Sequence, residues 1–180
     1  MLLGDGGRPF VLRDYQRACV DVAAERNVLC ALPVGSGKTV IAAEVIHAVL
    51  RMENEKKVVF LAPYGMLAKQ QLLLLMDRID RLHLGTDITA KPDASPVELA
   101  RWRAGLAVGQ SVDDDQLRTS WRKGFDENQL LVMTPAQFEK ALSHACISMA
   151  DIALLVIDEV RPRSHACTIM PHARARACGA

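Results

Sequence analysis

Residues 31–39 read "ALPVGSGKT", and this stretch carries most of what the 180-residue chain reveals about its architecture. It follows the short apolar run "NVLC" and precedes "VIAAEVIHAVL", in which apolar residues recur with helical spacing. The first pattern is typical of a buried strand, and the second of a helix that buries one face. Glycines between a strand and a helix, followed by a lysine, indicate a loop whose backbone approaches an anion closely.

The same loop matches the phosphate-binding pattern GxxxxGK[ST], apart from Leu32, which replaces the first glycine. In this pattern, backbone N–H groups and a helix N-terminus surround the phosphates of a nucleotide. Lys38 would reach the β and γ phosphates as a catalytic charge, and the hydroxyl of Thr39 would hold Mg²⁺. A chance glycine turn is the alternative, but the place of the loop between a strand and a helix favours phosphate binding. The predicted nucleotide contacts are Pro33, Val34, Gly35, Ser36, Gly37, Lys38 and Thr39.

Two acidic residues, Asp158 and Glu159, end the apolar run "LLVIDE". In a parallel sheet the carboxyl ends of the strands meet at one edge, which is where ligands bind. We therefore predict that Asp158 binds Mg²⁺ through water and that Glu159 orients and deprotonates the attacking water. An Asp-Glu pair at a strand end is common in loops of any kind, so this assignment depends on the glycine loop. Together the two motifs predict hydrolysis of a nucleoside triphosphate.

The rest of the chain alternates between strand and helix patterns. Apolar runs without interruption suit parallel strands that are covered on both faces, so the predicted fold class is α/β. Between residues 84 and 128 the pattern is weaker, and there we expect a strand at 86–90 and helices at 95–105 and 113–125. The other strands are predicted at 27–32, 57–63, 128–135 and 152–159, and the other helices at 12–25, 38–51, 66–79 and 136–145.

Composition restricts the class of protein. Hydrophobic residues make up 50% of the chain and the formal net charge is +1, as is typical of a globular domain. The five cysteines form no CxxC pair, which favours a reducing compartment. No apolar stretch is long enough to cross a membrane. We therefore expect an intracellular protein, cytoplasmic or nuclear, with no membrane partner.

The last segment, residues 160–180, differs from everything before it. It contains no acidic residue and no apolar periodicity, and four of the twenty-two basic residues lie in it, so the net charge is −3 up to Glu159 and +4 beyond. We expect this segment to be unstructured, and an intron or a shifted reading frame translated in error would explain its composition. The predicted organisation is a flexible N-terminus at 1–9, a nucleotide-binding domain at 10–159 and this tail.

Five motifs follow one another along residues 11–159: "LRDYQ", "LPVGSGKT", "FLAPYGMLAKQQ", "LLVMTPAQF" and "LLVIDE". In this order they resemble the first RecA-like domain of the superfamily 2 DExD/H-box helicases. The stretch "NQLLVMTPAQFEKALSHACISMADIALLVIDE" is most similar to the N-terminal helicase module of Dicer-like proteins. The resemblance implies a P-loop NTPase with a RecA-like parallel sheet and helices on both faces, incomplete at its C-terminus. It also implies ATP and Mg²⁺ as cofactors, and a helicase or translocase acting on double-stranded RNA, as in RNA interference.

The resemblance also assigns further site residues. Arg13 and Gln16 match the family motif that recognises adenine, in which the glutamine amide both donates to the base and accepts from it. Strand ends and helix starts offer N–H groups and hydroxyls to the nucleic-acid backbone in related enzymes. The matching positions in this chain are Pro63, Lys69, Thr134 and Pro135.

Several of these positions have a simpler explanation. An exposed helix lysine such as Lys69 is more often only solvated. Tyr64 stands where the family often has threonine, so this chain departs from the family at that hydroxyl contact. Trp102 and Trp121 could stack on bases. Packing in the core or anchoring of a helix is the favoured interpretation for both.

After Asp158 and Glu159 the family continues with Cys-His or Ala-His, whereas this chain has Val160 and Arg161. The resemblance therefore implies that the coupling histidine and the second RecA-like domain, with its arginine fingers, are missing. Since such arginines are worth several orders of magnitude in rate, the chain alone should hydrolyse ATP weakly or not at all. Two alternatives remain: a DNA-directed superfamily 2 helicase of the repair or restriction type, and a non-catalytic nucleotide- or RNA-binding fragment.

Overall fold

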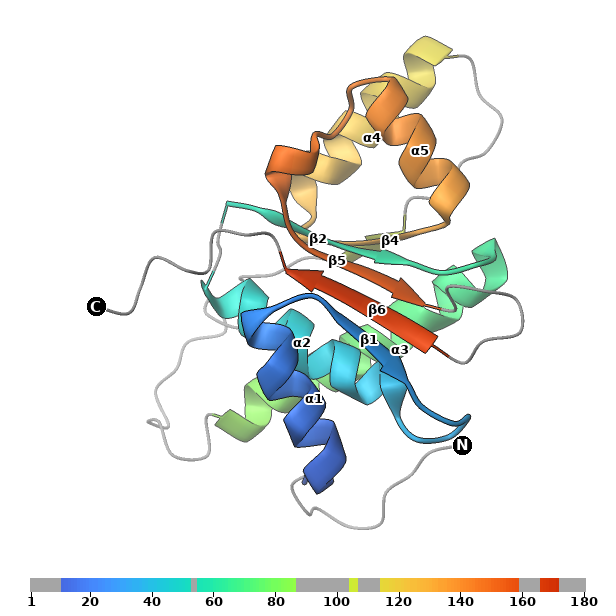
Figure 1. Cartoon of the computed structure of the whole chain (residues 1–180). Helices are drawn as coiled ribbons and strands as arrows, with labels where there is room; N and C mark the ends of the chain where they lie inside the picture. Colours follow the sequence, from blue (N-terminus) through green and yellow to red (C-terminus); the bar gives the residue numbers. More distant parts are fainter. Residues whose placement is uncertain (1–10, 53–54, 87–103, 107–113, 159–165, 172–180) are drawn as a thin grey trace, which may run out of the picture.

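A six-stranded sheet in the order β1-β6-β5-β2-β4-β3 lies at the centre of the structure (Figure 1). The computed structural model describes residues 11–52, 55–86, 104–106, 114–158 and 166–171. Within these ranges the strands are β1 (Val28–Ala31), β2 (Lys57–Leu61), β3 (Ala104–Leu106), β4 (Leu130–Met133), β5 (Ile152–Asp158) and β6 (Ala166–Pro171).

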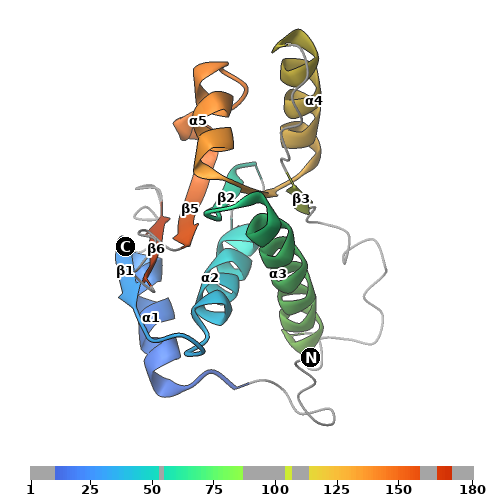
Figure 2. The same ribbon diagram turned by 90° about the vertical axis from the view of Figure 1, so that its right-hand side faces the viewer.

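Helices cover both faces of this sheet, which confirms the predicted α/β class. They are α1 (Asp14–Glu25), α2 (Lys38–Met52), α3 (Gly65–Thr86), α4 (Asp114–Glu127) and α5 (Pro135–Ser143), with a single 3-10 turn at Met149–Asp151. Helices α1, α2 and α3 lie on one face, and α4 and α5 lie on the other (Figure 1 and Figure 2). Among the helices in the described ranges, none combines the length and the apolar character needed to cross a membrane.

Four neighbouring strands, β3, β4, β2 and β5, run parallel to one another. Leu61 of β2 lies opposite Met133 of β4 on one side and Ile157 of β5 on the other. The carboxyl ends of these three strands therefore share one edge of the sheet. Parallel neighbours need a crossover of about a dozen residues or more, and α3, α4 and α5 lie in those connections.

Strand β6 corrects the prediction that residues 160–180 are unstructured. It lies between β1 and β5 and runs antiparallel to both, so the sheet is not parallel throughout. The connection from β5, residues 159–165, is shorter than the crossover of about a dozen residues that a parallel strand would need, which explains the direction. Ile169 is fully buried and Met170 is 36% exposed, so a short alternating pattern is present in the tail. The remainder of the tail lies outside the described residues.

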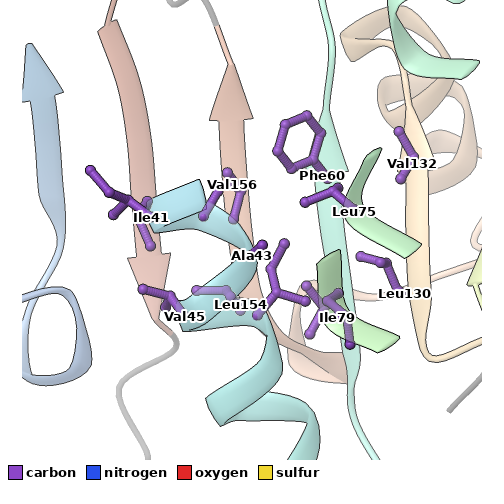
Figure 3. Packing of buried hydrophobic residues seen from close by; sticks show 14 of the residues in the cluster. Ile41, Ala43, Val45, Phe60, Leu75, Ile79, Leu130, Val132, Leu154 and Val156 are labelled. Carbon is purple, nitrogen blue, oxygen red and sulfur yellow. The ribbon is translucent and has the colours of Figure 1, made fainter. Parts of the chain in front are cut away.

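Two apolar layers hold the helices to the sheet. In the larger one, Ile41 of α2 and Leu75 of α3 pack with Phe60 of β2 between the sheet and helices α1 to α3 (Figure 3). On the opposite face, Trp121 of α4 packs in a second layer with Leu131 of β4. All four residues of β4 are buried. Burial on both faces explains why the parallel strands are continuous apolar runs in the sequence.

The region between α3 and β4 was predicted least well. Helix α3 continues to Thr86, beyond the predicted end at residue 79. Strand β3 occupies the end of the predicted helix at 95–105, so that prediction is wrong for Ala104 and Gly105. Helix α4 closely confirms the predicted helix at 113–125. The predicted strand at 86–90 lies, apart from Thr86, outside the described residues.

Candidate functional site

The glycine loop connects β1 to α2 and adopts a backbone conformation that glycine takes readily. Gly35 has a φ of 78° and Gly37 a φ of 83°, both in the left-handed region. A Cβ at Gly37 would also lie 2.5 Å from Nε2 of Gln16, so the Gln16 amide would have to shift to admit a side chain. The space around Gly35 is open. Glycine is therefore favoured at position 37 both by its own backbone conformation and by the close approach of the Gln16 side chain.

Lys38 begins α2, and its ammonium group bends back over the loop. Nζ donates to the carbonyl oxygen of Leu32 at 2.9 Å and to that of Pro33 at 3.0 Å. The first turn of α2 contains no acidic residue, so its own side chains do not offset the positive end of the helix dipole. The ammonium group and the N–H groups of the first helical turn together make the loop attractive to anions.

Helix α1 contacts the loop through two adjacent side chains. The Tyr15 hydroxyl donates to the carbonyl oxygen of Ser36 at 2.7 Å, and Nε2 of Gln16 donates to the same oxygen at 2.9 Å. Oε1 of Gln16 accepts from the backbone N–H of Arg13 at 3.0 Å, while Nη1 of Arg13 donates to the Tyr15 hydroxyl at 3.3 Å. The structure thus brings Arg13 and Gln16 to the glycine loop, and Gln16 fastens α1 to it.

The loop and the acidic strand end lie at the same edge of the sheet. Cys30 of β1 and Asp158 of β5 both pair with Cys167 of β6. Because β6 is antiparallel to both neighbours, β1 and β5 run in the same direction. Two strand spacings separate them, which is about 10 Å. The chain therefore leaves β1 toward the glycine loop at the edge where β5 ends in Asp158.

Asp158 is half-buried and receives a hydrogen bond from α3. Nε2 of Gln71 donates to Oδ2 of Asp158 at 3.3 Å. Glu159, the predicted general base, lies outside the described residues. The structure therefore places one of the two predicted acids.

The side chains at this edge fit a nucleoside triphosphate with a magnesium ion. The ammonium group of Lys38 and the loop N–H groups complement phosphate oxygens. The Thr39 hydroxyl and the Asp158 carboxylate are hard oxygen ligands of the kind that Mg²⁺ prefers. Thr39 is the second residue of α2 and is half-buried. The donor set is thus suited to both groups.

The predicted nucleic-acid contacts lie farther along the same edge. Pro63 follows β2 and Thr134 follows β4, and these two strands are parallel neighbours. Thr134 is the N-cap of α5: its hydroxyl accepts from the N–H of Gln137 at 3.4 Å, and its own N–H donates to Oε1 of Gln137 at 2.9 Å. Pro135 is the exposed first residue of α5, and Lys69 is exposed on α3. The structure brings Pro63, Thr134 and Pro135 to adjacent strand ends.

Trp121 belongs to the core. It is 6% exposed, and its ring meets that of Phe125 edge-on with 6.2 Å between the centroids. The prediction of core packing is therefore confirmed for Trp121. Trp102 lies outside the described residues.

Cys30, in β1 beneath the loop, has a strongly raised pKa. Burial raises the pKa of its thiol to about 11, and the neighbouring Cys19 of α1 adds to the rise through its charge and a hydrogen bond. Cys30 is 4% exposed. The thiol therefore stays protonated at neutral pH and behaves as a small apolar residue.

Two residues at this edge, Tyr15 and Gln71, were missed by sequence reasoning. Tyr15 stands next to Gln16, and this adjacency was the signal that could have found it. Gln71 and Asp158 are 87 positions apart in the sequence, and no local sequence pattern predicts a contact between residues so far apart.

Comparisons with known proteins bear on the same residues. The family described as DEAD/DEAH box helicase matches residues 13–162. Endoribonuclease Dicer homolog 2b of Oryza sativa subsp. japonica is 31% identical over 151 residues, which are 82% of this chain and 9% of the relative. ATP-dependent DNA helicase MPH1 of Scheffersomyces stipitis is 33% identical over 150 residues, which are 83% of this chain and 12% of the relative.

A solved structure shares the fold. The Hef helicase domain of Pyrococcus furiosus superposes with a TM-score of 0.60 and 25% identity, covering 82% of this chain and 26% of that one. The described sheet thus has the arrangement of a helicase domain. The chain spans roughly a tenth of the length of the two relatives named above, at 9% and 12%.

Proposed function

This chain belongs to the DEAD/DEAH box helicase family, and we propose that it is the ATP-binding domain of a nucleic-acid-dependent helicase or translocase. The main support for the proposal is the pairing of β1 and β5 with β6, because it brings the glycine loop and Asp158 to the same edge of the sheet. Lys38 and the loop N–H groups would hold the phosphates, and Thr39 and Asp158 would hold Mg²⁺. Bound Mg²⁺ would neutralise the charge that develops on the phosphates.

The adenine end of the site would be formed by Arg13 and Gln16. Gln16 already bonds Arg13 and Ser36, yet its amide keeps one further N–H and one further lone pair. One donor beside one acceptor is what the edge of adenine requires. Contact with the base would therefore bear directly on the phosphate-binding loop, because the same amide group joins both.

Hydrolysis would depend on Glu159, which would take the proton of the attacking water. The described residues form a single sheet, and arginine fingers from a second RecA-like domain are not among them. Such arginines raise phosphoryl-transfer rates by about 10³–10⁵-fold. We therefore propose that this chain by itself binds ATP and hydrolyses it weakly.

Double-stranded RNA is the proposed nucleic acid. Pro63, Thr134 and Pro135, at the ends of β2 and β4, would meet its phosphates on the same edge as the nucleotide. The rice relative is named an endoribonuclease Dicer homolog, which favours RNA. The yeast relative is named an ATP-dependent DNA helicase, so DNA is the second candidate.

Two measurements test the proposal. Binding of a fluorescent ATP analogue should weaken about tenfold or more in Lys38→Ala, because a charge-assisted contact to phosphate is lost. Lys140→Ala, which removes an exposed lysine from α5, is the matched control and should bind as the wild type does. Unchanged affinity in Lys38→Ala would overturn the nucleotide site. Competition between RNA and DNA duplexes of one sequence then decides between the two nucleic acids.

A further inference from the structure

The amide group of Gln71 lies beside the predicted metal ligand, and within the described part of the chain only one end of it is bonded. Nε2 donates to Oδ2 of Asp158 at 3.3 Å. Oε1 is buried and accepts no hydrogen bond from any residue in the described part of the chain. Buried polar atoms nearly always have a partner. Any donor to this acceptor therefore lies outside the described residues.

Asp158 fixes the orientation of this amide. An ionised carboxylate only accepts hydrogen bonds, so the NH₂ group of Gln71 faces Asp158 and the carbonyl oxygen faces away from Oδ2. The same bond restricts rotation of the carboxylate. This contact thus helps to set the direction of both side chains.

Helix α3 holds Gln71 at the strand ends. Leu75 is fully buried beneath the sheet and Leu72 packs against the same apolar layer, so this side of α3 is anchored. Gln70, the preceding residue, is exposed. Gln71 lies between the anchored and the exposed sides of the helix, where its amide reaches the last residue of β5.

We infer that Gln71 is a positioning residue for the magnesium ion. It orients the Asp158 carboxylate through the hydrogen bond that Nε2 donates to Oδ2. The inference rests on the proposed function, in which Asp158 holds the ion. Outer contacts of this kind hold a metal-binding carboxylate in the direction that the ion requires.

The test measures how nucleotide binding depends on Mg²⁺ and does not require turnover. The purified chain is titrated with a fluorescent ATP analogue, first in EDTA and then at increasing Mg²⁺. Gln71→Met keeps the size of the side chain and removes its amide. We expect the Mg²⁺ concentration at half-maximal enhancement to rise by about 10–100-fold, the usual effect of losing an outer contact to a metal ligand. Affinity in EDTA should not change.

The control is Gln70→Ala, which removes an exposed amide from the neighbouring position. It should leave both the affinity in EDTA and the Mg²⁺ midpoint at the wild-type values. A merely structural role for Gln71 would lower the melting temperature and the affinity in EDTA together. If Gln71→Met does not fold, as judged by circular dichroism, Gln71→Asn gives the same test, because its shorter side chain does not reach Asp158.

The Asp158→Asn variant distinguishes a failure of the proposed function from a failure of the inference about Gln71. If the wild type shows no Mg²⁺-dependent binding, or if Asp158→Asn retains all of it, the proposed function fails. If Asp158→Asn loses the dependence and Gln71→Met keeps the wild-type midpoint, the inference about Gln71 is overturned and the proposed function stands.

Discussion

Gln16 of α1 donates a 2.9 Å hydrogen bond from Nε2 to the carbonyl oxygen of Ser36 in the glycine loop. The other end of the amide is bonded to the backbone N–H of Arg13, and the side chain is only 3% exposed. This bond joins the segment that would contact adenine to the segment that would contact phosphate. A disturbance of either segment should therefore reach the other.

Gly37→Ala should disrupt the loop at this junction. A Cβ would lie 2.5 Å from Nε2 of Gln16, and the φ of 83° is unfavourable for alanine. We expect the free energy of unfolding to fall by about 1–3 kcal/mol, the usual cost of a strained backbone position. Binding of the fluorescent ATP analogue should be lost. Chemical denaturation and nucleotide titration measure the two effects.

Gly124→Ala is the matched control for this change. Gly124 lies within α4, and a Cβ there would meet nothing within 4 Å. Alanine favours the helix, so the free energy of unfolding should rise by up to about 1 kcal/mol. A Gly37→Ala protein as stable as Gly124→Ala would contradict the loop geometry.

Thr134→Ala should lower the free energy of unfolding by about 1 kcal/mol, because the hydroxyl caps α5. Thr134→Ser keeps a capping hydroxyl and should lose much less. Thermal or urea denaturation distinguishes the two variants. Equal stability of both would show that the cap contributes little.

Pro135→Glu tests the proposed nucleic-acid interface separately from the cap. An acidic residue in the first turn of a helix is stabilising, so α5 should keep its stability within about 1 kcal/mol. The added negative charge would face the phosphates, and affinity for duplex RNA should fall, as measured by fluorescence anisotropy. Full RNA affinity in this variant would remove Pro135 from the interface.

Thr168→Pro should separate β1 from the rest of the sheet. Thr168 pairs with Leu29 on one side and Ile157 on the other, and proline has no N–H to donate to such a ladder. We expect the free energy of unfolding to fall by about 1–3 kcal/mol, because a buried backbone group is left without a partner. Nucleotide binding should weaken as well. Thr168→Ser keeps the N–H and should behave like the wild type. Wild-type binding by Thr168→Pro would show that β6 is dispensable.

The stability of the protein should fall in alkaline solution because of Cys30. Burial raises the pKa of its thiol from 9.0 to about 11. The unfolded chain therefore loses this proton at a lower pH than the folded chain. The associated stability is complete below pH 9.0 and disappears as the pH rises to about 11. Urea denaturation across this window should show a shallower decline for Cys30→Ala, and identical slopes would contradict the prediction.

The parallel half of the fold could be predicted because its strands are buried on both faces. All residues of β4 and all but the first of β2 are buried, so each strand is a continuous apolar run that stands out in the sequence. The glycine loop could be predicted for a different reason. Its chemistry is confined to consecutive residues between one strand and one helix.

The remainder depends on partners that are distant in sequence. Strand β3 contains Ala104 and Gly105, which have little preference for strands, and it forms beside β4. Strand β6 fills a place between β1 and β5 that only the assembled sheet defines. The bond between Gln71 and Asp158 joins α3 to β5 in the same way.

Strand β6 also bears on the order in which the molecule assembles. Within the described sheet, β1 pairs with β6 alone. Residues 28–31 can therefore join the sheet only after residues 166–171 have formed β6. Closing so long a stretch of chain loses much conformational freedom before any pairing compensates for it, and contacts of this kind form slowly. The parallel strands can pair with each other earlier, because their partners are closer in sequence. We expect nucleotide-binding competence to arise in the closing phase of refolding, after most of the helical signal has returned.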